Sequence, residues 1–285
     1  MSKFSEKWIP SNFYASIDSL SFPFSTERFS NSHLPICSIL NNTEATRFIV
    51  LIVVSNSGRL LCMGSIIDES HILTARTCFT EVNIGSLLVI ANYLSPYFGR
   101  NSQVKFIDKV INHPHQLSMV VLERPLEFGL GVGPIQQMTP REFLRFPLEE
   151  YGEDYYIAGF LLSKFTTRGE SLLKTDLYTI GSEKVLKQFE CLKRIKKGKN
   201  EFYKKVYDRT IMFCSAGESE LCWTAVGSPT MMRVDGKYVQ VGVVYGASCE
   251  ANPTKSEKEN KPELTVHVRV DKFLKWIQTN SFMVR

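Results

Sequence analysis

The feature that most constrains the fold is a series of short apolar segments that are rich in β-branched residues and separated by turn residues. The first segment, Phe48 to Val54, reads FIVLIVV and is followed by the turn residues Ser55 to Gly58. Runs of this length and composition between turn signals are typical of β-strands. Further segments of this kind are Leu60–Ile67, Ile72–Ala75, Leu87–Ala91, Val104–Val110, Met119–Leu122, Tyr156–Leu161 and Val239–Tyr245. Many short strands with frequent turns predict an all-β sandwich or barrel.

The two ends of the chain depart from this pattern. Residues 1–36 are rich in Ser, Phe and Asn and show no periodicity, which predicts an irregular extension. Near the other end, four apolar residues have the spacing of an amphipathic helix, which we expect at about residues 270–280. These residues are Phe273, Leu274, Trp276 and Ile277.

Charge and hydropathy exclude several classes of function. The 34 basic and 29 acidic residues give a formal net charge of +5, and so small an excess does not indicate a nucleic-acid partner. No apolar run reaches the roughly 18 residues that a membrane-spanning helix needs. The first residues lack the apolar stretch of a secretion signal, which counts against export.

Cysteine usage leaves two compartments open. The chain has seven cysteines, and none of them form a C-x-x-C pair. The missing pairs argue against a zinc ribbon or a thioredoxin-type redox site, and we expect neither a metal nor a cofactor. An odd number fits either a cytosolic chain with free thiols or a secreted chain with three bridges and one spare cysteine.

A specific motif begins at the first cysteine of a pair that is 16 residues apart. Cys62 to Cys78 reads CMGSIIDESHILTARTC and resembles the first disulfide loop of trypsin-like serine proteases. Other blocks resemble that family in the family's own order, and together they span about Ile39 to Ile277. They are Asn112–His115, Gln116–Leu126, Val132–Gln137, Tyr156–Phe160, Thr224–Met231, Val241–Gly246 and Arg269–Ile277.

The resemblance implies an all-β fold of two packed six-stranded antiparallel β-barrels with a C-terminal α-helix. On this basis residues 37–285 form a trypsin-like domain after the irregular extension. Barrel one is expected at about residues 39–145 and barrel two at about residues 150–268.

The same resemblance locates the catalytic triad, and other residues occupy its places. Thr77 stands where the family has its histidine, Gln116 where it has its aspartate, and Val226 where it has its serine. A serine protease needs a hydroxyl nucleophile, an imidazole base and a carboxylate that orients the imidazole. None of the three residues can take these roles, so the resemblance implies a catalytically inactive homologue.

Two supporting parts of the family's machinery are altered as well. Thr224 replaces the glycine whose N–H helps to form the oxyanion hole. In the family, cleavage after a basic residue frees an amine that pairs with an aspartate beside the serine. Here those two positions hold Ser38 and Ala225.

An active protease with a relocated triad is the alternative. It would use His71 or His113 as the base and Ser228 as the nucleophile. His71 is expected on the turn before a strand, and His113 lies in a block where the family's histidine is not catalytic. A serine followed by proline in a tight loop is more often structural.

The resemblance also places four residues in the substrate-specificity pocket: Glu220, Tyr245, Gly246 and Thr265. Glu220 falls at the pocket floor, where a carboxylate could hold a basic side chain. Thr265 replaces a glycine of the pocket wall and should narrow the slot. We therefore expect an occluded pocket, with a working one as the alternative.

By the resemblance, six cysteines pair as Cys62–Cys78, Cys191–Cys214 and Cys222–Cys249. The family's fourth common bridge would join the positions of Tyr155 and Met232, so both partners are absent together. A single remaining partner would be a free thiol, so the loss of both is what a real disulfide framework predicts. Such a framework indicates an oxidising compartment. Cys37 is left over, either buried and free or linked to another chain.

A basic segment, residues 193–205, lies inside the second of these bridged loops. It is either a solvated surface loop or a contact site for an acidic surface, such as a sulfated glycan or an acidic protein. In the second case Phe202 and Tyr203 would provide an apolar anchor. Its basic residues are Lys193, Arg194, Lys196, Lys197, Lys199, Lys204 and Lys205.

The sequence therefore predicts a secreted, non-catalytic serine protease homologue, similar to those that insects make in immune and reproductive fluids. It would act as a regulator, cofactor or decoy in a proteolytic pathway. Its expected partners are proteases, inhibitors or receptors, with sulfated glycans as a further class. The alternatives are an active endopeptidase and an intracellular structural or storage protein.

Overall fold

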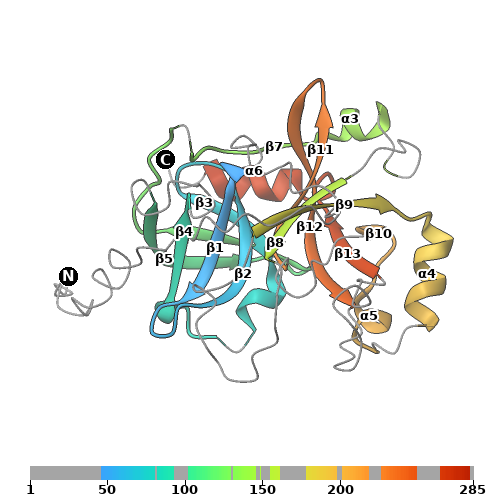
Figure 1. The fold of residues 1–285 in the computed structure, drawn as a ribbon, viewed down its shortest axis with the longest axis horizontal. Coiled ribbons are helices and arrows are strands. Elements are labelled where there is room, and N and C mark those ends of the chain that lie inside the picture. Colours follow the sequence, from blue (N-terminus) through green and yellow to red (C-terminus); the bar gives the residue numbers. More distant parts are fainter. Residues whose placement is uncertain are drawn as a thin grey trace, which may run out of the picture.

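A computed structural model describes most of the chain from residue 46 onward. The described residues are 46–80, 82–92, 102–129, 131–145, 148, 155–160, 178–197, 201–217, 226–248 and 264–282. The predicted extension at residues 1–36 and Cys37 lie outside them. Within these ranges the strands form two adjacent barrels (Figure 1).

Barrel one is a closed antiparallel barrel of six strands, in the order β1-β2-β3-β6-β5-β4. Its strands are β1 (Ile49–Val54), β2 (Arg59–Ile66), β3 (His71–Ala75), β4 (Leu87–Ala91), β5 (Gln103–Asn112) and β6 (Leu117–Leu122). Two short 3-10 helices, η1 (Arg76–Phe79) and η2 (Ile84–Ser86), connect β3 to β4.

Barrel two has the order β11-β8-β9-β10-β13-β12, and pairing of β11 with β12 closes it. Its strands are β8 (Tyr155–Phe160), β9 (Tyr178–Val185), β10 (Met212–Gly217), β11 (Pro229–Val234), β12 (Lys237–Ser248) and β13 (Leu264–Arg269). The two-residue strand β7 (Gln136–Gln137) adds to β12 in parallel. The predicted two-barrel fold is confirmed.

The alternation of side chains along β1 explains how the barrels pack together. Val50 and Ile52 point into the core of barrel one, because successive strand residues face opposite sides. Ile49, Leu51 and Val53 face the other way and pack with Met231 and Tyr238 of barrel two. Both faces of β1 are therefore buried, which is why its sequence is an unbroken apolar run.

A two-residue turn fixes the hairpin between β11 and β12. Val234 pairs with Lys237, and Asp235 and Gly236 between them have φ angles of 49° and 80°. Positive φ at both central residues defines the type I′ turn, for which Asp-Gly is a preferred sequence.

The C-terminal helix α6 (Leu274–Phe282) begins after a turn at residues 271–273. Phe273 and Trp276 both meet the ring of His113, with ring centroids 4.8 and 5.1 Å apart. The helix thus packs on the turn that joins β5 to β6 in barrel one. No helix among the described residues is long and apolar enough to cross a membrane.

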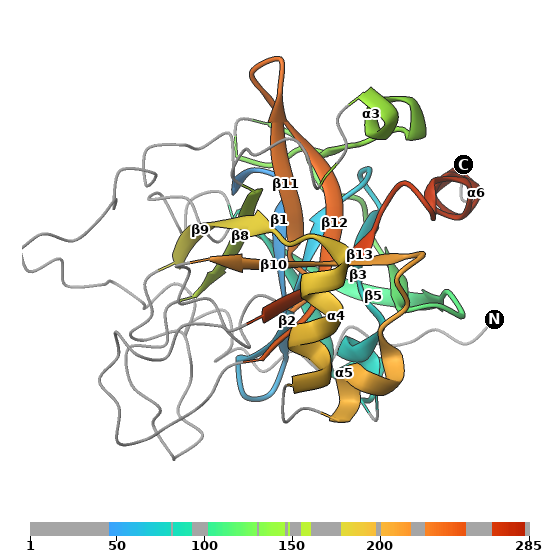
Figure 2. The same cartoon turned by 90° about the vertical axis from the view of Figure 1, so that its right-hand side faces the viewer.

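The basic segment that was considered as a surface loop is mostly helical. It folds into α4 (Gln188–Lys197) and α5 (Glu201–Val206), which contact each other beside β10 (Figure 2). Cys191 and Ile195, four residues apart, are the buried positions of α4. This spacing buries one stripe of the helix and leaves its basic residues on the exposed side.

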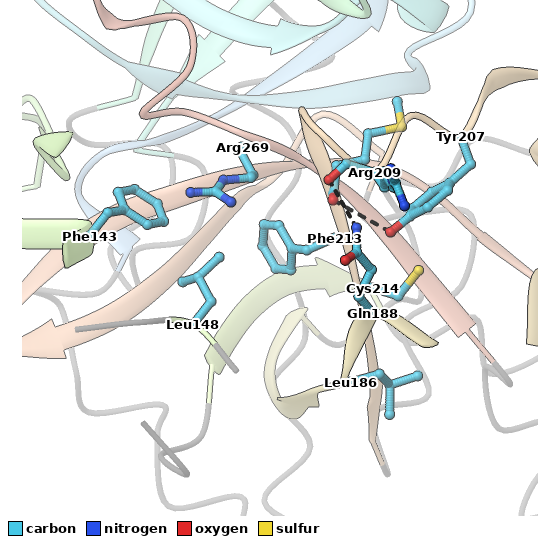
Figure 3. Close-up of a pocket in the computed structure, with 10 residues that line it drawn as sticks. Phe143, Leu148, Leu186, Gln188, Tyr207, Arg209, Phe213, Cys214 and Arg269 are labelled. Atoms are coloured by element: carbon cyan, nitrogen blue, oxygen red, sulfur yellow. Dashed lines mark hydrogen bonds between the residues drawn. The ribbon is translucent and has the colours of Figure 1, made fainter. Parts of the chain in front are cut away.

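A cavity of about 300 Å³ lies on barrel two beside α3 (Pro140–Arg145) and the start of α4 (Figure 3). Its wall includes Phe143 of α3, Gln188 of α4 and Phe213 of β10. None of the predicted triad or pocket residues that the structure describes lines this cavity.

Candidate functional site

Thr77 and Gln116 are neighbours at one edge of barrel one. Thr77 lies in η1, directly after β3, and Gln116 directly precedes β6. The backbone N–H of Arg76 donates to the carbonyl oxygen of Gln116 at 2.9 Å. Cys78, next to Thr77, is bonded to Cys62 of β2 with a Cα–Cα distance of 5.9 Å.

Val226 lies between the two barrels and close to the same disulfide. Its carbonyl oxygen accepts a hydrogen bond of 2.9 Å from the N–H of Met63, which follows Cys62. The next residue, Gly227, donates to the carbonyl oxygen of Val244 in β12 at 2.8 Å. The backbone of Val226 is therefore connected to barrel one on one side and to barrel two on the other. Thr77, Gln116 and Val226, the positions that the sequence predicts for the triad, therefore all lie near this disulfide.

The side chains of Thr77, Gln116 and Val226 offer no group for acid–base or nucleophilic chemistry near neutral pH. The hydroxyl of Thr77 is buried and has no hydrogen-bond partner among the described residues. Gln116 carries a neutral amide, and Val226 has no polar side-chain atom. The residues Ser38, Thr224 and Ala225, which the sequence also singled out, lie outside the described residues.

The histidines considered as alternative bases have other partners. His71, which is 2% exposed, has its Nδ1 2.7 Å from Oδ1 of Asp68. His113 packs against α6, and burial lowers the pKa of its imidazole. Ser228 is fully buried, and its Oγ has no hydrogen-bond partner among the described residues. No relocated triad forms from these three residues.

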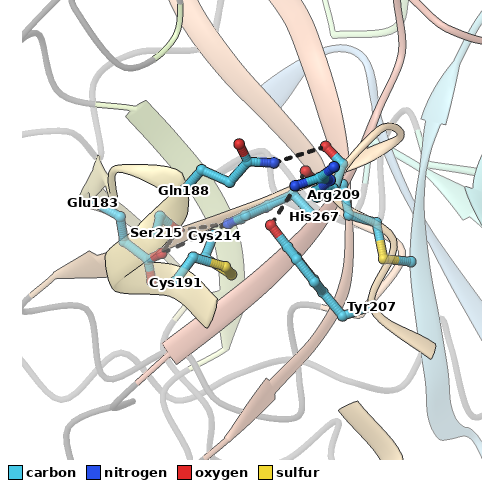
Figure 4. The surroundings of a disulfide bond; sticks show 9 residues. Glu183, Gln188, Cys191, Tyr207, Arg209, Cys214, Ser215 and His267 are labelled. Carbon is cyan, nitrogen blue, oxygen red and sulfur yellow. Dashed lines mark hydrogen bonds and ion pairs between the residues drawn. A yellow bond between two sulfur atoms is a disulfide. The ribbon is translucent and has the colours of Figure 1, made fainter. Parts of the chain in front are cut away.

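A serine, a histidine and a glutamate do meet elsewhere, inside barrel two (Figure 4). Ser215 of β10 donates its hydroxyl to Glu183 of β9 and lies 2.5 Å from Nε2 of His267 on β13. The sequence analysis missed this cluster. The barrel creates it because Ser215 pairs with Val185 and Thr265, which stand two residues from Glu183 and His267 on the same faces.

The hydrogen bonds of this cluster differ from those of a catalytic triad. In a triad the serine donates to the imidazole and the acid holds the opposite ring nitrogen. Here the single hydrogen of Ser215 goes to Glu183, so Nε2–H of His267 donates to Ser215. The other nitrogen, Nδ1, accepts from the hydroxyl of Thr230 at 2.8 Å. Ser215 is thus not oriented for deprotonation by His267.

Burial also separates this cluster from any substrate. Ser215 and His267 are 0% exposed and Glu183 is 1% exposed. Desolvation lowers the pKa of His267 to about 3, which keeps its imidazole neutral. The cluster is a satisfied polar network in the core of barrel two.

Thr265 links this network to the predicted specificity pocket. Its hydroxyl donates to Glu183 at 3.1 Å, and the residue is 1% exposed. Two further pocket positions are packed: Tyr245 is buried, and a Cβ on Gly246 would overlap with the hydroxyl of Tyr203. Burial raises the pKa of Tyr203 and of Tyr245 to about 12. Glu220, the predicted pocket floor, lies outside the described residues.

Tyr203 was expected to anchor a partner, and the structure corrects this. The residue is 5% exposed and belongs to the main apolar core. Its position on α5 points it inward, because the helix buries one face against barrel two. The Phe202 side chain and Lys199 lie outside the described residues.

The other basic residues of the segment lie on the exposed side of the two helices. Arg194 forms an ion pair on this side, with Nη2 2.8 Å from Oε1 of Glu190. The exposed residues are Lys193, Arg194, Lys196, Lys197, Lys204 and Lys205.

A second disulfide fixes α4 to barrel two. Cys191 of α4 is bonded to Cys214 of β10, with a Cα–Cα distance of 5.7 Å. The predicted pair Cys222–Cys249 lies outside the described residues. At the positions of the family's fourth bridge, Tyr155 and Met232 are each 1% exposed and share one apolar cluster. No group of His, Cys, Asp or Glu in the described part of the chain could hold a metal ion.

Two closed six-stranded barrels, with a disulfide beside their junction, define a protein of the double-barrel serine protease class. The profile of the trypsin family matches residues 40–277. The chain belongs to the trypsin family. A comparison with curated proteins finds no match.

Proposed function

We propose that this chain is a catalytically inactive member of the trypsin family that acts by binding other proteins. The observation that supports the proposal is the disulfide-linked junction of the barrels, close to which lie Thr77, Gln116 and Val226, the positions that the sequence predicts for the triad. Loss of one triad member lowers the rate by roughly 10⁴ to 10⁶. Loss of all three leaves no group that can take the proton or attack the carbonyl.

The fluorophosphonate reaction tests this proposal, because the reagent labels only an activated serine. We expect no label on the full-length chain under conditions that label bovine trypsin completely. Two buried serines, Ser215 and Ser228, are the candidate nucleophiles of an active enzyme. The Ser215→Ala and Ser228→Ala variants are therefore tested with the same reagent. Label that disappears in either variant would identify a working serine and establish the alternative, an active endopeptidase.

The cysteines support an extracellular setting. Two bridges, Cys62–Cys78 and Cys191–Cys214, are formed, and structural disulfides persist in oxidising compartments. In such a setting an inactive homologue acts as a regulator, cofactor or decoy for proteases, their inhibitors or receptors. The motifs resemble those of the inactive homologues that insects make in immune and reproductive fluids.

The exposed faces of α4 and α5 are the surface that we propose for an anionic partner. They present six exposed basic side chains, and Arg194 among them is paired with Glu190. Clustered cations on one surface raise the local concentration of anionic partners and bind them in a salt-dependent way. A sulfated glycan or an acidic protein has the matching charge.

Heparin chromatography of two variants that have the same net charge tests this surface. We expect a variant with Lys193, Lys197 and Lys205 changed to Ser to elute at lower salt than the wild type. The control variant changes three exposed lysines elsewhere, Lys109, Lys237 and Lys275, and should elute close to the wild type. Equal elution of both variants would show that only total charge matters.

A further inference from the structure

The cavity on barrel two combines apolar walls with hydrogen-bond donors. Phe143, Leu148, Leu186 and Phe213 form apolar parts of its wall. The polar side chains in the wall are Gln188, Tyr207, Arg209 and Arg269, and no carboxylate of a described residue lines it. Figure 3 shows Arg209 beside Tyr207 on one side and Arg269 beside Phe143 on the other.

The two arginines of the wall differ, because Arg269 is already paired with a described carboxylate and Arg209 is not. Arg269 donates from Nε and Nη2 to the carboxylate of Asp271, both at 2.9 Å, and its Cζ lies 5.0 Å from the ring centre of Phe143. The guanidinium of Arg209 makes no hydrogen bond or close ion pair with a described residue, and the carboxylate of Asp208, which it influences from a greater distance, is exposed to solvent. One guanidinium is therefore free to pair with an anion at the cavity.

The neighbouring polar groups leave this cation accessible. Nε2 of Gln188 donates to the backbone carbonyl oxygen of Arg209 at 3.4 Å. The hydroxyl of Tyr207 donates to the backbone carbonyl oxygen of Met212 at 3.5 Å. These contacts use backbone oxygens and do not neutralise the guanidinium. A planar guanidinium next to aromatic walls suits a ligand that has both a flat ring and an anionic group.

We propose that this cavity binds an aromatic ring that carries one anionic group, such as an aryl sulfate. The volume of about 300 Å³ is at the small end of ligand sites, which fits a single ring and its substituent. Arg209 pairs with the anionic group, and the ring packs against Phe213 and its apolar neighbours. The site is independent of the junction and of whether the chain is catalytically inactive.

Binding of phenyl sulfate to the full-length chain, measured by ligand-observed NMR and calorimetry, tests the proposal. Phenol lacks the charge and methyl sulfate lacks the ring, so both should bind at least about tenfold more weakly. Phenyl sulfate that binds no better than either analogue would overturn the proposal.

A matched pair of variants locates the binding. Arg209→Gln should weaken phenyl sulfate at least about tenfold, because it removes one charge-assisted contact. Arg233→Gln is the control, since Arg233 also lies near an aromatic ring, 5.4 Å from that of Tyr238, but on the β11–β12 hairpin. Thermal unfolding of both variants establishes that they are folded. Equal loss in both, or no loss in Arg209→Gln, would refute the assignment.

A blocked five-residue peptide with sulfotyrosine between alanines distinguishes the source of the ligand. Competition between this peptide and phenyl sulfate for the same site would indicate a sulfated side chain of a protein partner. Binding of phenyl sulfate alone would indicate a free small molecule. Both outcomes support the proposed chemistry, and failure of both ligands to bind contradicts it.

Discussion

At the scale of single residues, Gly227 shows how closely the two barrels approach beside Val226. It has a φ of +83°, and a Cβ there would overlap with the carbonyl oxygen of Met63 and the hydroxyl of Thr74. Thr74 itself donates to that carbonyl oxygen at 2.6 Å. Glycine is thus required both by the backbone conformation and by the contact.

Replacing Gly227 by alanine should lower the free energy of unfolding by about 3 kcal/mol or more, because strain and overlap add. Gly236→Ala is the control, with φ at +80° and no atom within 4 Å of the added Cβ. It carries the conformational strain alone, roughly 1 kcal/mol. Urea denaturation measures both, and equal losses would contradict the close approach at the junction.

His267 makes the stability of the fold sensitive to acid. An unfolded histidine titrates near pH 6.5, whereas burial lowers the pKa of His267 to about 3. Between these values the unfolded state binds more protons, so the free energy of unfolding falls as the pH falls below about 6.5. The slope from this one group is at most about 1.4 kcal/mol per pH unit.

A His267→Gln variant should therefore lose part of the slope of stability against pH between about pH 5 and pH 6.5. Glutamine keeps a donor and an acceptor for Ser215 and Thr230 but does not titrate. His115→Gln, at the surface, separates the effect of burial from the loss of one histidine. Urea denaturation across this pH range gives the slopes, and an unchanged slope in His267→Gln would argue that the imidazole is charged in the fold.

At the scale of elements, the Cys191–Cys214 bridge determines where α4 lies. It joins residues 23 apart in sequence and connects the buried stripe of α4 to β10. Because α4 carries most of the exposed basic residues, the bridge also holds the proposed anionic-partner surface against barrel two.

Replacing both cysteines by alanine should lower the free energy of unfolding by about 2–4 kcal/mol. The physical reason is that the unfolded chain regains the freedom that a closed loop denies it. Limited digestion with trypsin is the second measurement, and we expect faster cleavage at the lysines of α4. If stability and cleavage rate both match the wild type, the bridge does not hold the helix in place.

At the scale of the whole molecule, the two barrels share one apolar core. Val50 and Ile72 of barrel one belong to the same cluster of buried residues as Val243 and Val266 of barrel two. A core that spans both barrels couples their stability, because neither can unfold without exposing part of the other's apolar surface.

We therefore expect a single unfolding transition, despite the chain length and the two barrels. Far-UV circular dichroism reports the strands and near-UV circular dichroism the packing of the aromatic side chains. Under non-reducing conditions, the two signals should change at the same urea concentration. Two separated transitions would show that the barrels unfold independently.

Several strands and the place of the junction followed from local features of the sequence. The apolar run of β1 and the turn after it predicted a strand without reference to any other part of the chain. The spacing of Cys62 and Cys78 located the first disulfide loop, and with it Thr77. Such features are readable because the residues that cause them are close together in sequence.

Other parts of the fold had weaker local signals. β9 reads YTIGSEKV and carries the buried Glu183, so it lacks the apolar pattern of a strand. β13 reads LTVHVR and does alternate apolar and polar residues, but its polar residues Thr265 and His267 are buried as well. The helices α4 and α5 were considered as a loop because their many lysines concealed a narrow buried stripe at Cys191 and Ile195.

The sequence by itself predicted which residues stand at the triad positions, because the motifs that resemble the trypsin family are local. Only the tertiary structure decided that Ser215, His267 and Glu183 form one buried network. Glu183 is 32 positions and His267 is 52 positions from Ser215, and the pairing of β9, β10 and β13 brings the three together. Such contacts depend on the register of several strands, which no short stretch of sequence specifies.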